Sequence, residues 1–109
     1  MNLKPLAEQY FETFSRKDIN SLAEMFEPDV ILRDWEIFAA GKEDVIKANQ
    51  KIFDSVDSIQ VTPKNIYQED NTIIADLKIL VNGVEELKVV DIIHFDRHGK
   101  ISRINAYKG

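Results

Sequence analysis

Hydrophobic residues near the start of the chain recur at the spacing of one helix face. The first such stripe consists of Leu3, Ala7, Tyr10 and Phe14. Steps of three and four residues bring side chains to the same side of a helix, so this stripe predicts a helix over residues 5–16. Asp18 is a good helix-capping residue, and it predicts a second, short helix over residues 18–26 that must end before Pro28.

The next part of the chain predicts a strand, an irregular segment and a further helix. Residues 30–34 have the composition of a short strand, whereas residues 35–41 show no regular period. Over residues 45–56 the hydrophobic residues return to helical spacing and predict a third helix. Asn49 is a polar residue inside this third stripe.

After Ser58 the pattern changes to a period of two residues. Four strands are predicted, over residues 59–68, 72–81, 84–96 and 101–107. Asn82-Gly83 favours a hairpin turn strongly and His98-Gly99 more weakly, because these residues accept positive φ. Helices followed by a run of antiparallel strands predict an α+β fold with the helices packed on one face of a curved sheet.

An acidic residue, Asp91, interrupts an apolar face of the strand over residues 84–96. Its neighbours at every second position are Leu87, Val89, Ile93 and Phe95. Because an ionised carboxylate is costly to remove from water, we expect Asp91 to be protonated, hydrogen-bonded or both. A neutral carboxylic acid can donate a strong hydrogen bond, which makes Asp91 a candidate catalytic donor. The alternative is that this face is turned to solvent, or that an arginine or a backbone group satisfies the carboxyl.

Composition narrows the class of protein. The chain has 109 residues, of which 44% are hydrophobic and 30% charged, as expected for one globular domain over residues 1–109. A net charge of −5 without a basic stripe argues against nucleic acid as a partner. The absence of cysteine and the presence of only two histidines predict no disulfide, metal site or cofactor. Without an apolar leader or a membrane span, we expect a cytoplasmic protein that does not bind membranes.

The order of elements and the end of the chain point to a known superfamily. The densest motif lies in residues 89–101 and includes Phe95-Asp96, Gly99 and Lys100-Ile101, followed by Asn105-Ala106-Tyr107. It resembles the final hairpin of the nuclear-transport-factor-2-like superfamily, and within that group the ketosteroid isomerases and SnoaL-like proteins. The resemblance implies a cone-shaped α+β fold in which three N-terminal helices pack on a curved antiparallel sheet.

The resemblance also implies three catalytic residues. Tyr10 matches the first-helix tyrosine that donates to the substrate carbonyl oxygen, Asp34 the aspartate that moves a proton, and Asp91 a protonated aspartate that donates to the same oxygen. Removing a proton beside a ketone builds negative charge on that oxygen, and fixed donors stabilise it. A carboxylate that first takes the proton can return it as an acid.

Each of these residues also has a purely structural interpretation, and other positions differ from the relatives. Tyr10 can be a core aromatic residue, and Asp34 can close a strand as a turn residue. Phe26 and Asn49 stand where ketosteroid isomerases often support the tyrosine with further tyrosines, and only Asn49 can donate. Lys108 replaces an aromatic residue near Asp34, where an ammonium would weaken the base. The other expected pocket residues are Phe14, Trp35, Ala75, Leu77, Val89 and Ile93.

Three functions are compatible with these patterns. The first is a ketosteroid-isomerase-like enzyme that moves a double bond into conjugation with a ketone through an enolate. The second is a SnoaL-like polyketide cyclase, and the third is a non-catalytic module for small-molecule binding or dimerisation. The expected ligand is a small apolar ketone or a polyketide-like molecule. Val90 and Ile92, on the strand face opposite Asp91, predict a homodimer through the outer face of the sheet.

Overall fold

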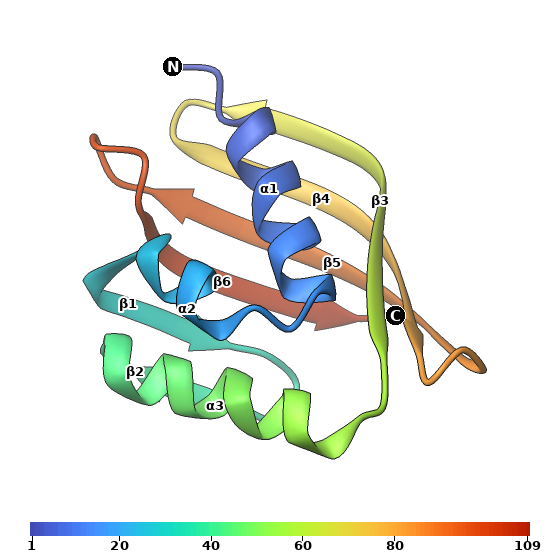
Figure 1. Cartoon of the computed structure of the whole chain (residues 1–109). Helices are drawn as coiled ribbons and strands as arrows, with labels where there is room; N and C mark the ends of the chain where they lie inside the picture. The colour runs from blue at the N-terminus through green and yellow to red at the C-terminus, as the bar shows by residue number, and fades with distance from the viewer.

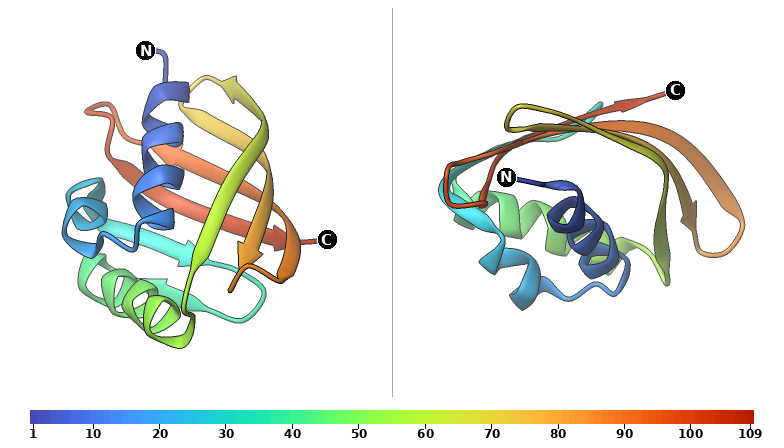
Figure 2. Two further views of the ribbon diagram at one scale, coloured as in Figure 1. Left: turned by 45° about the vertical axis from the view of Figure 1, so that its right-hand side comes forward. Right: turned by 90° about the horizontal axis from the view of Figure 1, so that it is seen from above.

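A curved six-stranded sheet covers three helices in the computed structural model, which describes residues 1–109. The helices are α1 (Lys4–Ser15), α2 (Ile19–Glu24) and α3 (Lys42–Ser55). The strands are β1 (Phe26–Arg33), β2 (Phe38–Ala40), β3 (Ile59–Glu69), β4 (Thr72–Val81), β5 (Glu85–Phe95) and β6 (Ile101–Lys108). Figure 1 shows the helices on one side of the sheet, and Figure 2 shows the sheet arching over α1. The predicted α+β architecture is confirmed.

The sheet has the order β2-β1-β6-β5-β4-β3 and is antiparallel except where β1 lies beside β6. The predicted hairpin between β4 and β5 is present. Asn82 and Gly83 both have positive φ, 54° and 72°, as a tight hairpin turn requires. Gly99 has a φ of 79° in the turn between β5 and β6. These local turns place the four long strands in sequence order along the sheet.

The inner face of the sheet carries the apolar row of β5 that the sequence predicts, beside a second apolar row from β4. Ala75 of β4 lies opposite Asp91 of β5, and Leu77 lies opposite Val89. Since alternate residues of a strand share a face, Asp91 points to the same side as the core residues of both strands. The face that carries Asp91 is therefore turned toward the helices and not toward solvent.

The second helix is shorter than predicted. It begins after Asp18, whose side chain accepts a hydrogen bond from the Ser21 backbone N–H at 3.2 Å, and it ends at Glu24. Phe26 is already in β1, beside Ile101 of β6. The prediction of a helix through Phe26 was wrong because Pro28 favours extended backbone ahead of it and because β6 offers a strand to pair with.

The segment over residues 35–41 is not wholly irregular, contrary to the prediction. It contains β2, which pairs with the end of β1 and places Ala40 opposite Ile31. Asp34 closes the connection: its Oδ1 accepts hydrogen bonds from the backbone N–H groups of Glu36 at 2.7 Å and Ile37 at 2.6 Å. A strand of three residues is too short to show a period of two residues.

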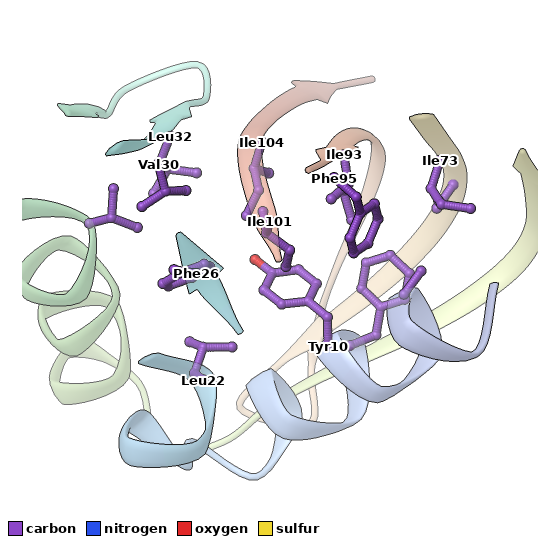
Figure 3. Packing of buried hydrophobic residues seen from close by; sticks show 14 of the residues in the cluster. Tyr10, Leu22, Phe26, Val30, Leu32, Ile73, Ile93, Phe95, Ile101 and Ile104 are labelled. Carbon is purple, nitrogen blue, oxygen red and sulfur yellow. The ribbon is translucent and has the colours of Figure 1, made fainter. Parts of the chain in front are cut away.

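Buried side chains from helices and sheet form one core (Figure 3). Phe26, Ile93 and Ile101 are almost completely buried, and Tyr10 projects from α1 among them. Only one end of the interior is filled in this way, and the other end remains open, as described below. No helix combines the length and the apolar character needed to cross a bilayer.

Candidate functional site

A cavity of about 230 Å³ opens between α1, α3 and the inner face of the sheet. We call it the central cavity. Seventeen of its 21 lining residues are hydrophobic, and Tyr10, Asp34, Asn49 and Asp91 all lie on its wall. Apolar walls with a few convergent polar groups are typical of small-molecule sites. A larger groove of about 360 Å³ near Met1 and His98 contains none of these four residues.

Tyr10 reaches the central cavity from the middle of α1. Tyr10 is only 5% exposed, and its ring packs against Phe14 and Phe26, whose ring centroids lie 6.2 and 6.4 Å from its own. Burial, and secondly the charge of Asp91, raise the pKa of the Tyr10 hydroxyl well above its ordinary value of 10.0. The hydroxyl therefore keeps its proton at neutral pH and can donate it in a hydrogen bond.

The Tyr10 hydroxyl has no hydrogen-bond partner within the protein. No buried polar side-chain atom is sealed off without a partner, so the hydroxyl oxygen must be accessible from the central cavity. The interpretation of Tyr10 as a core aromatic residue is correct for its ring, but its hydroxyl is not used to hold the fold together. This group is free to bind a ligand.

Asp91 lies on β5 between two small residues, Ala75 of β4 and Ala106 of β6. It is 8% exposed and makes no hydrogen bond to another protein group, so its carboxyl also faces the central cavity. Burial first, and the charge of Asp34 second, raise the pKa of Asp91 from 3.8 to about 7. Neither an arginine nor a backbone group satisfies this carboxyl. Below about pH 7 it is a neutral donor beside an apolar space.

Asp34 is fixed at the rim of the central cavity by the turn that follows β1. Its Oδ1 accepts the two backbone hydrogen bonds from Glu36 and Ile37, while its Oδ2 accepts none within the protein. Asp34 therefore closes the turn with one oxygen, as its structural interpretation expects, and its second oxygen is left without a protein partner. A carboxylate held by one oxygen has a defined direction, which a proton-transfer group requires.

Of the nine other expected pocket residues, five line the central cavity and four do not. Those that line the central cavity are Phe14, Trp35, Asn49, Leu77 and Val89. Phe26, Ala75, Ile93 and Lys108 do not line it, which corrects the expectation. Ala75 and Ile93 have no exposed surface because they lie deeper in the filled core, and Phe26 packs behind the Tyr10 ring.

Lys108 lies at the mouth of the cavity and not on its wall. It is exposed at the end of β6, and its Nζ lies 5.9 Å from the ring centroid of Trp35, which is itself 44% exposed. An ammonium at this distance over an indole ring is attracted to its face. We conclude that Lys108 contacts the rim residue that follows Asp34.

Much of the apolar wall was not predicted from the sequence. The additional lining residues include Phe11, Leu32, Ile37, Ile52, Val56, Ile59, Val61, Ile79, Val81, Leu87, Ile104 and Ala106. Several of them continue patterns already visible in the sequence: Ile79 and Val81 extend the inner row of β4, and Ile52 belongs to the α3 stripe. Following each row to its end would have found these positions. The one additional polar lining residue, Glu36, had no such signal.

No cluster of three or more histidine, cysteine, aspartate or glutamate side chains is arranged to hold a metal ion. The donors of this site are instead two O–H groups, those of Tyr10 and neutral Asp91, and the free acceptor is the carboxylate of Asp34. A site of this composition can move a proton and stabilise charge on an oxygen.

Fold and site together define a cone-shaped, nuclear-transport-factor-2-like α+β protein with an apolar cavity. The family model described as SnoaL-like domain matches residues 7–104, and the chain belongs to this family. No curated protein matches the sequence.

Solved structures with the same fold have diverse descriptions. A candidate ketosteroid isomerase from Kribbella flavida is 20% identical with a TM-score of 0.86, over 98% of this chain and 77% of that one. A candidate SnoaL-like polyketide cyclase from Shewanella denitrificans is 11% identical with a TM-score of 0.87, over 98% and 90%. A nuclear-transport-factor-2-like protein of unknown function from Cytophaga hutchinsonii is 12% identical with a TM-score of 0.83, over 100% and 91%. At these identities the likeness establishes the fold, and activity must be argued from the site.

Proposed function

We infer that the protein is an isomerase that shifts a double bond into conjugation with a ketone. The observation that carries this inference is the convergence of Tyr10, Asp34 and Asp91 on one apolar cavity, with the donor groups of Tyr10 and Asp91 left without protein partners. Donor groups that face an apolar cavity without a protein partner are unfavourable for folding alone. A ligand oxygen that accepts from both groups gives a reason for them.

The reaction uses the three side chains in sequence. The Asp34 carboxylate removes a proton from the carbon between the carbonyl and the double bond, and the electrons of that C–H bond move to the carbonyl oxygen. Tyr10 and neutral Asp91 donate hydrogen bonds to the resulting enolate oxygen. Asp34 then returns the proton to the far carbon of the former double bond, which leaves a conjugated ketone and a carboxylate ready for the next cycle.

The apolar wall supports this chemistry in two ways. It binds the hydrocarbon part of a ketone, and it keeps the pKa of Asp91 near 7, so that a neutral donor is present in mildly acidic and neutral solution. Enolate formation would be much less favourable beside an ionised Asp91, since two negative charges would then face each other.

A polyketide cyclase is the second candidate, favoured by the family match and by the description of the relative from Shewanella denitrificans. Such an enzyme also removes a proton beside a carbonyl, and the carbanion then attacks another carbonyl of the same chain. The same three residues would support that first step. The two candidates therefore differ in the ligand that fits and not in the proton-transfer groups.

The experiment that tests the proposed function follows the growth of conjugated-enone absorbance. Purified protein is mixed separately with a β,γ-unsaturated cyclohexenone and a β,γ-unsaturated ketosteroid, and the rate is compared with that of Tyr10→Phe. Wild type should convert at least one ketone, and Tyr10→Phe should be slower by about 10²-fold because one donor to the enolate is lost. Binding without turnover of either ketone would favour a binding module, and cyclisation of a polyketide analogue alone would favour the cyclase.

The outer face of the sheet is proposed to pair two copies of the chain. It exposes large side chains on neighbouring strands, with Tyr67 of β3 beside Ile74 of β4 and Val90 of β5 beside Tyr107 of β6. Wild type should sediment as a dimer, and Val90→Lys as a monomer because each copy would bury an ammonium. Val84→Lys, in the β4–β5 turn, is the matched control and should remain a dimer. A monomeric wild type would disprove this pairing.

A further inference from the structure

Asn49 is a buried polar residue that the proposed reaction does not use. It lies in the middle of α3, is 2% exposed and lines the central cavity. Its Nδ2 donates to the Val45 carbonyl, one turn back in the same helix, at 3.0 Å. No donor of the protein reaches its Oδ1, and since no buried polar side-chain atom is sealed off without a partner, Oδ1 is accessible from the cavity.

The orientation of this amide follows from its neighbour. A carbonyl oxygen can only accept, so the Asn49 atom that faces the Val45 carbonyl must be the nitrogen. The acceptor Oδ1 is left for the cavity. An acceptor cannot stabilise an enolate oxygen, so Oδ1 requires a donor that the ligand itself carries, an O–H or an N–H.

Asn49 has little structural reason to be at this position. Its hydrogen bond stays within its own helix, to a carbonyl that already belongs to the helical ladder, and hydrophobic residues such as Ile52 surround the rest of this wall. A leucine would fill a similar volume without a buried polar group. The amide is best explained by a ligand that uses it.

The size and charge of the central cavity restrict that ligand further. A volume of about 230 Å³ equals roughly eight water molecules at their liquid volume and is below the usual range for drug-sized ligands. Three acidic residues, Asp34, Glu36 and Asp91, line the cavity, and no lysine, arginine or histidine does. An anionic ligand would be repelled, whereas a neutral ligand of one or two rings is suited to the space.

We propose that the substrate is a neutral ketone of one or two rings that carries a second polar group, a hydroxyl or an N–H, which donates to Asn49 Oδ1. The ketone oxygen lies between Tyr10 and Asp91. The hydrogen bond from the second polar group to Asn49 makes the site specific for such ketones and fixes the orientation of the substrate in the cavity. The ketone part of this proposal rests on the proposed function. The donor for Asn49 rests on the geometry of α3 alone.

Binding of naphthols tests the inference without requiring turnover. β-Naphthol has one hydroxyl, which is expected to bind at Tyr10 and Asp91. Dihydroxynaphthalene isomers with a hydroxyl at the same ring position carry a second hydroxyl at various other ring positions. Trp35 fluorescence or calorimetry gives each Kd. At least one diol should bind wild type about fivefold more tightly than β-naphthol, as one additional neutral hydrogen bond allows. Asn49→Leu should remove this preference.

For each variant, the Kd of β-naphthol is divided by the Kd of the diol, so that a general change in affinity or folding cancels in the ratio. Ile52→Val, which alters the same helix face without a polar group, is the matched control and should keep the wild-type ratio. The proposal is overturned if no diol exceeds β-naphthol, if Asn49→Leu keeps the preference, or if the four-ring diol estradiol or the anion hydroxynaphthoate binds as well as the best diol.

These outcomes are separable from those of the isomerase experiment. A preference for one diol that depends on Asn49, without turnover of any ketone, would support the recognition of a donor group and contradict the isomerase. Turnover of a simple cyclohexenone, together with no diol preference, would support the isomerase and contradict the role of Asn49.

Discussion

Replacing Asp34 with asparagine is expected to lower kcat for isomerisation by about 10²- to 10⁴-fold, the usual contribution of a positioned proton-transfer group. The fold should survive, because an asparagine Oδ1 can accept the same backbone hydrogen bonds from Glu36 and Ile37 that the aspartate accepts at 2.7 and 2.6 Å. The β1–β2 turn is then retained and only the proton acceptor is lost. Enone absorbance measures the first effect and thermal unfolding the second.

Two further variants make this result specific. Asp34→Ala removes both the base and the turn hydrogen bonds, so it should lose activity and also unfold at a lower temperature than Asp34→Asn. Asp29→Asn neutralises an exposed carboxylate on β1, the strand that precedes Asp34, outside the central cavity, and should retain activity. If Asp34→Asn turned over at the wild-type rate, Asp34 would not be the base.

Replacing Asp91 with leucine is expected to stabilise the fold while it removes activity, and the stabilisation should depend on pH. The pKa of Asp91 is about 7 in the folded protein against 3.8 ordinarily. Below about pH 4 the carboxyl is protonated in both states and contributes no penalty. Between about pH 4 and 7 the unfolded chain ionises while the folded protein keeps its proton, so the free energy of unfolding falls by about 4 kcal/mol in all.

Urea unfolding of wild type and Asp91→Leu at several values of pH measures this difference. The advantage of the leucine variant should grow from about pH 4 to pH 7 and stay constant above it. Asp91→Asn, which also cannot ionise, should follow the same pH dependence and separates the effect of charge from that of hydrophobicity. If the free energy of unfolding changed with pH in the same way for wild type and both variants, Asp91 would have an ordinary pKa in the folded protein.

The sequence predicts those parts of the fold that rest on local patterns. The Asn82-Gly83 turn and the alternation in β4 and β5 are properties of neighbouring residues, and they correctly place Asp91 on the inner face. The pairing of β1 with β6 joins residues far apart in the chain, and no local pattern indicates it. The end of α2 was misplaced for the same reason, because Phe26 is drawn into β1 by that distant strand.

The candidate site was also only partly predictable from the sequence. The resemblance to a family indicated Tyr10, Asp34 and Asp91, and all three lie on one cavity. The boundary of that cavity was harder to predict, because Leu77 lines it and Ala75, two residues earlier in the same row, does not. Alternation tells which face a residue occupies, but only the curvature of the sheet decides where along the strand the helices stop filling the interior.

The parallel pairing of β1 with β6 also affects the order in which the parts of the site assemble during folding. The ladder from β3 to β6 is built of hairpins between consecutive strands and can form from short-range contacts, whereas β1 can join it only after β6 is in place. Asp34 follows β1, so it meets Asp91 at this late step. On a ribosome the central cavity would stay incomplete until β6 had left the exit tunnel, because only the pairing of β1 with β6 places Asp34 on the same cavity as Asp91.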